Sequence, residues 1–423
     1  MENIELNKNV SLTMINTSQF KDILLTVRFL CPLTRKNGMI RSILAQMLQD
    51  RCAAWPTKQA LSEHLDELYG ATVITKASSY GQCLAFEYRF KCLNDQYTNE
   101  NTFERLFKTA HEFIFNPLMK DGQLDCELFE EARREVVFAN QRKLDQPHAR
   151  AIEKACAIMG KDQALAEMQL VTEEEINAIT LQEVTDMVQQ MLHQDQIMIF
   201  VIGKIDKELS SRYVQRFMPF DGRDIVVDSA YVLKPVQQQI EQEEIAAIDQ
   251  TMLVMMYNSD INIVSQDYWK MRVANGLFGQ LPTSLLFQEV REKRSLCYSI
   301  SSNAMPYEGA VICSTGIQKS RIDEVKNCIE QQLKRMQKGD FSDDDLETSI
   351  KMLKNAVLAS YDDPNSIINF AFQNALLNQD MQVEDCIKAI ELTTRKDVVR
   401  LFSQLKLAVI FCLKQEEQNE SAY

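Results

Sequence analysis

The feature that most constrains the fold of this chain is an internal duplication. A long helical region at about residues 124–160 is broken at Asp145-Gln146-Pro147, and a second at about residues 343–378 is broken at Asp362-Asp363-Pro364. Proline removes a backbone donor and restricts the residue before it, so each site ends one helix, and we expect a further helix after it. The two breaks lie 217 residues apart, about half of the 423-residue chain.

Apolar runs of strand length repeat in the same order in both halves. Residues 23–27 have a counterpart at residues 252–256, and each run precedes a polar turn and a helical stretch. Each half also ends in a run of β-forming residues, at 197–201 and at 407–411. Tight turns between strands, with long helices after them, predict an α+β fold. We expect two homologous α/β-sandwich domains, each a mostly antiparallel sheet with helices packed on it.

Local patterns predict further elements in the first half. The expected strands lie at residues 10–14, 72–76 and 84–90, and the expected helices at residues 38–51 and 58–68. The second of these helices places Leu61, Leu65 and Leu68 on one face, which is the spacing of an amphipathic helix.

The joint between the halves is expected within residues 203–250. This stretch contains Pro219, Gly222 and a polar run at residues 237–244, a composition typical of an exposed connector. We place the boundary at residue 225. The chain would then consist of an N-terminal domain of residues 1–225 and a C-terminal domain of residues 226–423.

Composition and charge narrow the class of protein. The net charge is −14, from 46 basic and 60 acidic side chains, and no Lys/Arg cluster stands out, which disfavours nucleic acid as a partner. The 11 cysteines contain no C-x-x-C and sit in apolar runs, as buried thiols do in a reducing compartment. The first residues resemble no secretory signal, and no apolar run approaches the ~20 residues of a membrane helix. We therefore expect a cytoplasmic protein without membrane insertion.

Motifs for metal, nucleophilic or phosphate chemistry are incomplete or missing. Zinc peptidases need two histidines on one helix face, but His111 begins an H-E-x-x-H pattern that ends in Phe115. His64 begins an H-x-x-E-H pattern that ends in Leu68. Both are expected to be surface-helix positions. The sequence also has no G-x-S-x-G, no Cys beside a His and no glycine-rich phosphate loop.

The most distinctive segment is residues 285–300, LLFQEVREKRSLCYSI. It predicts a helix that ends near Lys293, followed by a strand from about Leu296. The segment closely resembles the second half of the pitrilysin/insulinase-type zinc peptidases, which include mitochondrial processing peptidase. Their pattern there is L-F-x-x-[LIV]-R-E-[KR]-x-x-L-x-Y. The resemblance implies that Arg291 and Tyr298 correspond to the catalytic Arg and Tyr that point at the substrate carbonyl opposite the zinc.

Both residues also have a purely structural interpretation. An arginine near the C-terminus of a helix is favourable because of the helix dipole. A tyrosine at the start of a strand is often part of the core, with only its hydroxyl in water.

The resemblance covers essentially the whole chain but fails at the zinc motif. The zinc helix of the family reads G-[LIV]-[AS]-H-x-x-E-H-[ML]-x-F, and residues 38–48 match it here. Arg41 and Ala45 stand in place of the two histidines, and Leu44 stands in place of the general base. The third ligand of the family is a glutamate, which falls near Glu130, Glu131 or Glu135. A carboxylate without the two imidazoles is a poor zinc site, so we expect no metal or other cofactor in this chain.

Some members of the family divide the active site between two chains. The resemblance implies that this chain is the subunit without zinc in a heterodimeric peptidase, with Arg291 and Tyr298 facing a homologous zinc-containing partner that carries H-x-x-E-H. The family's active members assemble as four-domain clamshells, so this chain would form half of one. The substrate would be an extended peptide lying as an added strand on a sheet edge. A homodimer of the isolated chain would also fit.

Two alternatives stay open at this point. The chain could be a non-enzymatic peptide-binding or scaffold subunit of the same fold, or a stand-alone enzyme with an unrecognised site. Relatives of this type occur in bacteria in peptide maturation and in translation-factor modification, and the sequence does not distinguish these contexts.

Overall fold

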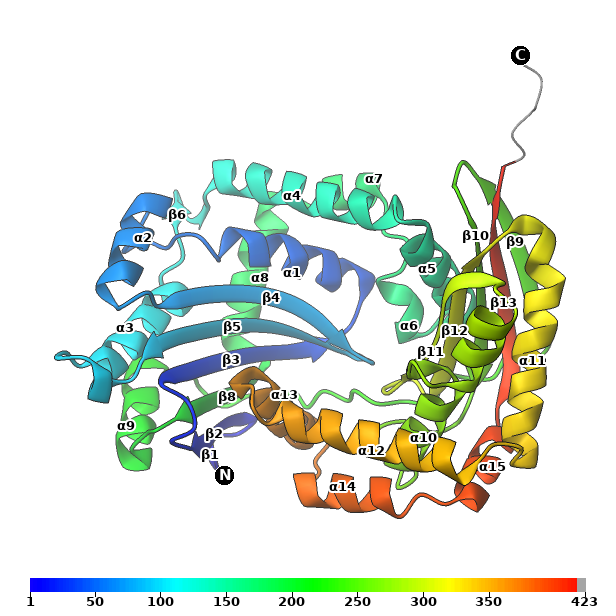
Figure 1. Ribbon diagram of the computed structural model, residues 1–423. Coiled ribbons are helices and arrows are strands. Elements are labelled where there is room, and N and C mark those ends of the chain that lie inside the picture. Colours follow the sequence, from blue (N-terminus) through cyan, green and yellow to red (C-terminus); the bar gives the residue numbers. More distant parts are fainter. Residues whose placement is uncertain (417–423) are drawn as a thin grey trace. The chain divides into compact units, whose positions relative to one another are not determined.

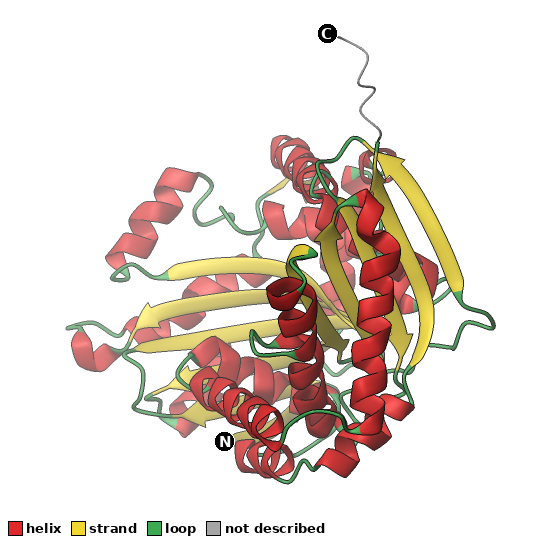
Figure 2. Cartoon of the chain, turned by 45° about the vertical axis from the view of Figure 1, so that its right-hand side comes forward, coloured by secondary structure: helices red, strands yellow, loops and turns green. Residues whose placement is uncertain are grey.

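The computed structural model describes residues 1–416, whose strands form two main sheets with helices packed on them (Figures 1 and 2). The chain divides into two compact units, each composed of segments that are not contiguous in sequence. Unit 1 contains residues 1–141, 171–229 and 363–378, and unit 2 contains the rest. No helix within residues 1–416 combines the length and apolarity needed to cross a membrane.

Unit 1 is built on a six-stranded sheet. Its strands, in spatial order, are β1 (Glu2–Asn7), β2 (Val10–Asn16), β8 (Gln196–Gly203), β3 (Asp22–Pro32), β5 (Cys83–Leu93) and β4 (Thr72–Tyr80). Only β2 and β8 run parallel, and every other neighbouring pair is antiparallel.

Unit 2 is built on a five-stranded sheet. Its strands, in spatial order, are β11 (Cys297–Met305), β12 (Ala310–Ile317), β10 (Thr251–Asn258), β13 (Lys406–Gln415) and β9 (Ile240–Ala246). Only β13 and β9 run parallel.

The two sheets have the same topology once β1 is set aside. The order β4-β5-β3-β8-β2 in unit 1 corresponds to β11-β12-β10-β13-β9 in unit 2, and the single parallel pair stands at the same end. The repeated runs at residues 23–27 and 252–256 lie in β3 and β10, the third strand of each order. The structure therefore confirms the α+β prediction of two homologous sandwiches.

Helices cover both faces of the unit 1 sheet. Its helices are α1 (Arg35–Met47), α2 (Lys58–Glu67), α3 (Thr102–Phe115), α4 (Cys126–Leu144), α7 (Glu173–Asn177), α8 (Leu181–His193), α9 (Lys207–Phe217) and α13 (Pro364–Leu376). Figure 1 shows α1 and α13 on opposite sides of this sheet. Strand β3 is buried on both faces, which explains its continuous apolar run in place of the alternation of a half-exposed strand.

Unit 2 has a corresponding set of helices. They are α5 (Pro147–Met159), α6 (Ala164–Glu167), α10 (Tyr268–Asn275), α11 (Ile322–Lys338), α12 (Asp343–Ser360), α14 (Val383–Glu391), α15 (Arg395–Ser403) and the π-helical segments η2 (Gly276–Gln280) and η3 (Phe287–Lys293). Helix α5 packs with Val254 and Val409 on one face of the sheet, whereas Leu253 and Met255 face the larger core on the other.

The two Asp-x-Pro breaks mark a reciprocal exchange of helices. Helix α4 belongs to unit 1, but the chain beyond Pro147 packs in unit 2. Helix α12 belongs to unit 2, but the chain beyond Pro364 packs in unit 1. Each proline occupies the first turn of the new helix, where its missing N–H costs no hydrogen bond.

A buried arginine anchors α13 on the unit 1 sheet. Arg28 of β3 donates from Nε to Glu87 Oε2 at 2.6 Å and from Nη2 to Asn369 Oδ1 of α13 at 2.5 Å. Its guanidinium carbon lies 4.0 Å from the centroid of the Phe372 ring. Since Arg28 and Phe372 are both fully buried, these contacts fix the helix in its place.

The stretch expected as an exposed connector differs from that expectation. Its middle, residues 218–239, lacks helix and strand, but α9 precedes this part and β9 follows it. Part of the polar run lies in β9 at the edge of the sheet. Its carboxylates pair with cations there, as Glu241 does with Lys326 at 2.5 Å. The boundary at residue 225 stays a prediction. The two compact units are defined by contacts in space, and such contacts do not show where the two duplicated halves of the sequence meet.

Candidate functional site

Segment η3 and strand β11 position Arg291 and Tyr298 in unit 2. Val290 is fully buried in the core and fixes the segment that carries Arg291. The chain then reverses at Ser295, whose φ of 51° lies in the left-handed region, and the Leu296 N–H donates to the Val290 carbonyl at 2.9 Å. This tight reversal starts β11 close to the helix, so that residues seven positions apart become neighbours.

Arg291 and Tyr298 lie side by side. The guanidinium carbon of Arg291 is 5.5 Å from the centroid of the Tyr298 ring and 4.5 Å from that of the Phe287 ring. The pairing of β11 with β12 is irregular between Cys297 and Ile300, which turns Tyr298 outwards. The Tyr298 residue is 80% exposed and the Arg291 side chain 37% exposed, so both are open to a ligand.

Buried polar contacts hold the elements around this pair. Ser302 of β11 donates to the Asn275 side chain at 2.7 Å, and Asn275 Nδ2 donates back to the Ser302 carbonyl at 3.2 Å. Gly279 is required beside them, because a Cβ there would lie 2.6 Å from Ser302 Oγ. On the other side, Arg335 of α11 lies 3.3 Å from Glu289 of η3.

Arg41, Leu44 and Ala45, which the sequence resemblance aligns with the zinc motif, are buried in unit 1. Arg41 of α1 donates from Nη1 to the Phe29 carbonyl at 3.1 Å and from Nη2 to Asp195 Oδ2 at 2.5 Å. Burial raises the pKa of Asp195 to about 6, and the Arg41 charge limits that rise. Leu44 and Ala45 pack in the core. These side chains point into the unit and leave no open coordination position.

A polar pocket of about 230 Å³ lies beside these positions, between α1, α2 and α4. Its lining residues are Gln46, Gln49, Asp50, Lys58, Leu128, Glu131, Ala132 and Glu135. Two candidates for the family's third ligand, Glu131 and Glu135, thus line this pocket together with Gln46 and Gln49. Arg41 and Ala45 are not among its lining residues. The remaining candidate, Glu130, pairs with Arg133 at 2.6 Å.

Protein cations pair with two carboxylates of this pocket, those of Asp50 and Glu131. Lys58 Nζ lies 2.9 Å from Asp50 and 3.1 Å from Glu131, and Arg51 lies 3.4 Å from Glu131. The hydrogen bond from Lys58 lowers the pKa of Glu131. These residues do not fit a zinc ion. Within residues 1–416, no group of three or more His, Cys, Asp or Glu side chains could hold a metal. Whether the purified chain carries metal stays a matter of prediction.

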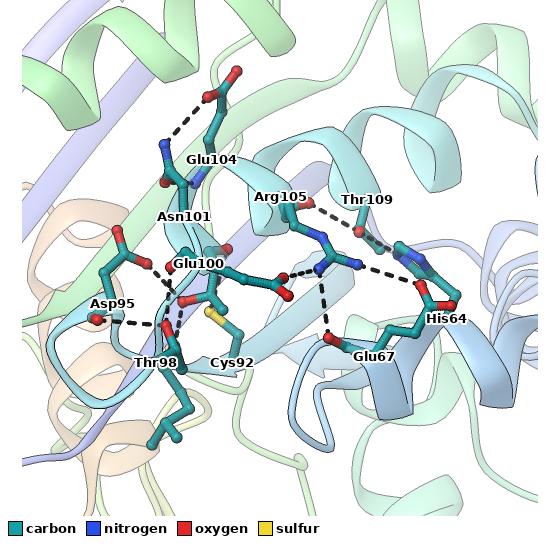
Figure 3. A network of polar contacts seen from close by, with 12 residues as sticks. His64, Glu67, Cys92, Asp95, Thr98, Glu100, Asn101, Glu104, Arg105 and Thr109 are labelled. Carbon is teal, nitrogen blue, oxygen red and sulfur yellow. Dashed lines mark hydrogen bonds and ion pairs between the residues drawn. The ribbon is translucent and has the colours of Figure 1, made fainter.

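His64, one of the two histidines in the incomplete zinc motifs, makes structural contacts. His64 Nε2 lies 2.9 Å from Thr109 Oγ1 (Figure 3). The His64 ring also stacks on Trp55 with ring centroids 3.8 Å apart, and burial lowers the pKa of His64. Figure 3 also shows Arg105 of α3 between Glu67 and Glu100. Its ion pair with Glu67 ties α2 to α3, whereas Glu100 lies just before α3.

His111 and His148 are engaged in the same way. His111 Nδ1 lies 2.8 Å from the carbonyl of Phe217, and His148 Nε2 lies 2.9 Å from Ser314 Oγ. Neither histidine stands beside a second imidazole in a metal-binding arrangement among the described residues.

The chain is similar in sequence and fold to several bacterial proteins. Residues 178–353 match the family described as the Peptidase M16 inactive domain. The chain is 25% identical over 413 residues to the "Probable inactive metalloprotease YmfF" of Bacillus subtilis, covering 96% of this chain and 95% of that one. A conserved protein from Enterococcus faecalis superposes with a TM-score of 0.93 at 26% identity over 99% of both chains. The chain is therefore similar to proteins of the M16 peptidase family.

The M16 family is the pitrilysin/insulinase type, so the resemblance of residues 285–300 is confirmed at the level of the family. A Pseudomonas fluorescens structure described as a peptidase M16 inactive domain shares the fold, with a TM-score of 0.80 at 14% identity over 99% of this chain and all of that one. These similarities support a catalytically incomplete M16 homologue.

Proposed function

We propose that this M16 homologue is the subunit without zinc in a heterodimeric peptidase that processes extended peptides. Its partner would be a homologous chain that carries H-x-x-E-H and the metal. This chain would contribute Arg291, Tyr298 and the opposite wall of the chamber. The observation that carries the proposal is the exposed Arg291–Tyr298 pair, in a chain where core contacts occupy the residues that the resemblance aligns with the zinc motif.

The chemistry of the pair suits peptide hydrolysis. Attack on a peptide carbonyl converts its oxygen into an oxyanion, and donors already in position stabilise that charge most effectively. The Arg291 guanidinium carries a fixed positive charge with planar donors, and the Tyr298 hydroxyl supplies one further donor. Neither of these two donors requires that this chain bind a metal.

The structural interpretations of the two residues differ in strength. Tyr298 is 80% exposed, so it does not serve as a core residue with a wet hydroxyl. Arg291 does lie in the last turn of η3, where the helix dipole favours a cation, but that role does not require its contact with Tyr298.

The test is reconstitution with an H-x-x-E-H homologue from the same source. Size-exclusion chromatography of the co-expressed chains should give a complex of about 1:1, and a fluorogenic peptide should be cleaved by the mixture and not by this chain alone. In assembled complexes Tyr298→Phe should lower kcat by about 10²–10³, because one oxyanion donor is lost. Arg291→Ala should cost at least as much.

Arg294→Ala is the matched control, since Arg294 is exposed three residues away in the same segment and should leave turnover unchanged. Thermal melting confirms that each variant is folded. Wild-type turnover from both Tyr298→Phe and Arg291→Ala would refute the catalytic role and favour a peptide-binding or scaffold subunit. A chain that never pairs with such a homologue would refute the heterodimer.

A further inference from the structure

Phe287 is an aromatic residue that the core of unit 2 does not use. Its neighbours in η3 and just before it, Leu285, Leu286 and Val290, belong to the buried apolar cluster beneath the segment. Phe287 belongs neither to that cluster nor to the partly buried residues packed against it, and its side chain is half-buried. Packing in the core of unit 2 therefore does not explain the position of the Phe287 ring.

The ring lies against the Arg291 guanidinium. The guanidinium carbon is 4.5 Å from the Phe287 centroid and 5.5 Å from the Tyr298 centroid, so Arg291 has an aromatic ring within cation–π distance from each of two elements. The nearest carboxylate is that of Glu292, 3.6 Å from Arg291 Nε, at the limit of an ion pair. The rings therefore restrain this side chain more than any salt bridge does.

This arrangement orients the donors without consuming them. The N–H groups of a guanidinium point outwards in its own plane, whereas a cation–π contact uses its charge and leaves the donors free. A strong salt bridge would restrain Arg291 equally well but would occupy the donors with a carboxylate. The aromatic contacts thus leave the guanidinium restrained and still able to bind an oxyanion.

We propose that Phe287 is a positioning residue, which together with Tyr298 holds the Arg291 guanidinium oriented for an oxyanion. The inference rests on the proposed function for its purpose, but the positioning itself can be measured on the isolated chain. Phe287→Leu removes the aromatic face and keeps an apolar side chain, whereas Phe287→Tyr keeps the face. The tyrosine variant should therefore behave as the wild type does.

The first measurement needs no partner. The purified chain is treated with phenylglyoxal, which modifies accessible arginines, and peptide mapping by mass spectrometry gives the rate at Arg291 relative to that at Arg294. We expect Phe287→Leu to raise this relative rate by about two- to fivefold, the size of one exposed cation–π contact. We expect Phe287→Tyr to leave it unchanged. An unchanged rate in Phe287→Leu, with an unchanged melting temperature, would overturn the inference.

The second measurement uses the reconstituted peptidase. Phe287→Leu should lower kcat by about the same two- to fivefold and leave KM unchanged, with rescue by Phe287→Tyr. A higher KM with unchanged kcat and unchanged Arg291 reactivity would make Phe287 a substrate contact and overturn the positioning role. If Phe287→Leu changes Arg291 reactivity but Arg291→Ala has wild-type kcat, the positioning stands and the proposed function fails. If Arg291→Ala lowers kcat but Phe287→Leu changes neither quantity, the proposed function stands and the positioning fails.

Discussion

At the residue scale, Arg41, which the sequence resemblance aligns with a zinc ligand, is part of the core of unit 1. Its guanidinium is fully buried, and its bonds go to Asp195 and to the Phe29 carbonyl. Removing one member of a buried ion pair leaves the other charge without a partner, which typically costs about 3–5 kcal/mol. We therefore expect Arg41→Ala to lower the free energy of unfolding by about 3–5 kcal/mol, measured by urea denaturation.

Two variants make this prediction specific. Arg134→Ala on the exposed face of α4 is the control and should change stability by less than about 0.5 kcal/mol. The double variant Arg41→Met/Asp195→Leu should recover much of the loss, because it leaves neither charge buried. Full stability in Arg41→Ala would show that the ion pair does not support the fold.

The residues of the candidate site were predictable to different degrees. Arg291 and Tyr298 lie within one local motif, so the sequence alone indicated the pair. Phe287 stood in the same motif, four positions before Arg291, but its contact depends on where the ring points. The partner of Arg41 was not predictable, since Asp195 lies 154 residues away and only the packing of α1 brings them together.

At the scale of elements, the ion pair between Arg35 and Glu175 ties the start of α1 to α7. Arg35 Nε and Nη2 lie 2.6 and 2.7 Å from the two Glu175 carboxylate oxygens, and the hydrogen bond from Arg35 lowers the pKa of Glu175 to about 2. The carboxyl has a lower pKa folded than unfolded. Its contribution to stability is therefore present above about pH 4.5 and is lost as the pH falls towards about 2.

Arg35→Ala should consequently destabilise the protein by up to about 1 kcal/mol at about pH 7, because the pair is only half-buried. The difference from the wild type should shrink steadily between about pH 4.5 and 2, as followed by denaturant melts across this range. Lys351→Ala, which removes an exposed partner of Glu347, is the control for loss of a surface cation. A difference independent of pH would contradict the assigned role of Glu175.

The local sequence predicted where two of the helices end, but it did not predict which elements they pack against. The prolines at 147 and 364 predicted where α4 and α12 end, and the structure has α5 and α13 beginning there. Nothing local indicated that α13 packs on the sheet of the other half. Its contact with Arg28 joins residues 341 positions apart, and many buried faces of similar apolarity would have suited the helix.

At the scale of the whole molecule, the exchanged helices should make the two halves interdependent. A fragment of residues 1–229 lacks α13 and would expose Leu24, Phe200 and the rest of the cluster that packs against it. A fragment of residues 230–423 lacks α5. We expect neither fragment alone to show near-ultraviolet circular dichroism typical of a packed core, and we expect native-like signal on mixing them.

Two matched fusions of the first fragment test the cause directly. Adding residues 363–378 through a flexible linker to the fragment of residues 1–229 should restore part of the near-ultraviolet circular dichroism. Adding a second copy of residues 147–159 in the same way should not restore it. Cooperative unfolding of the unmodified first fragment on its own would contradict the interdependence of the halves.

We propose that this chain has no zinc centre of its own and operates beside one that a homologous partner provides. Zinc analysis by mass spectrometry, on the purified chain and on its 1:1 complex with an H-x-x-E-H homologue, tests this most directly. With Arg41, Leu44 and Ala45 buried and Glu131 paired with Lys58, we predict no bound zinc in the chain alone and about one zinc per heterodimer. One tightly bound zinc in the isolated chain, or two per complex, would show that this chain binds zinc itself.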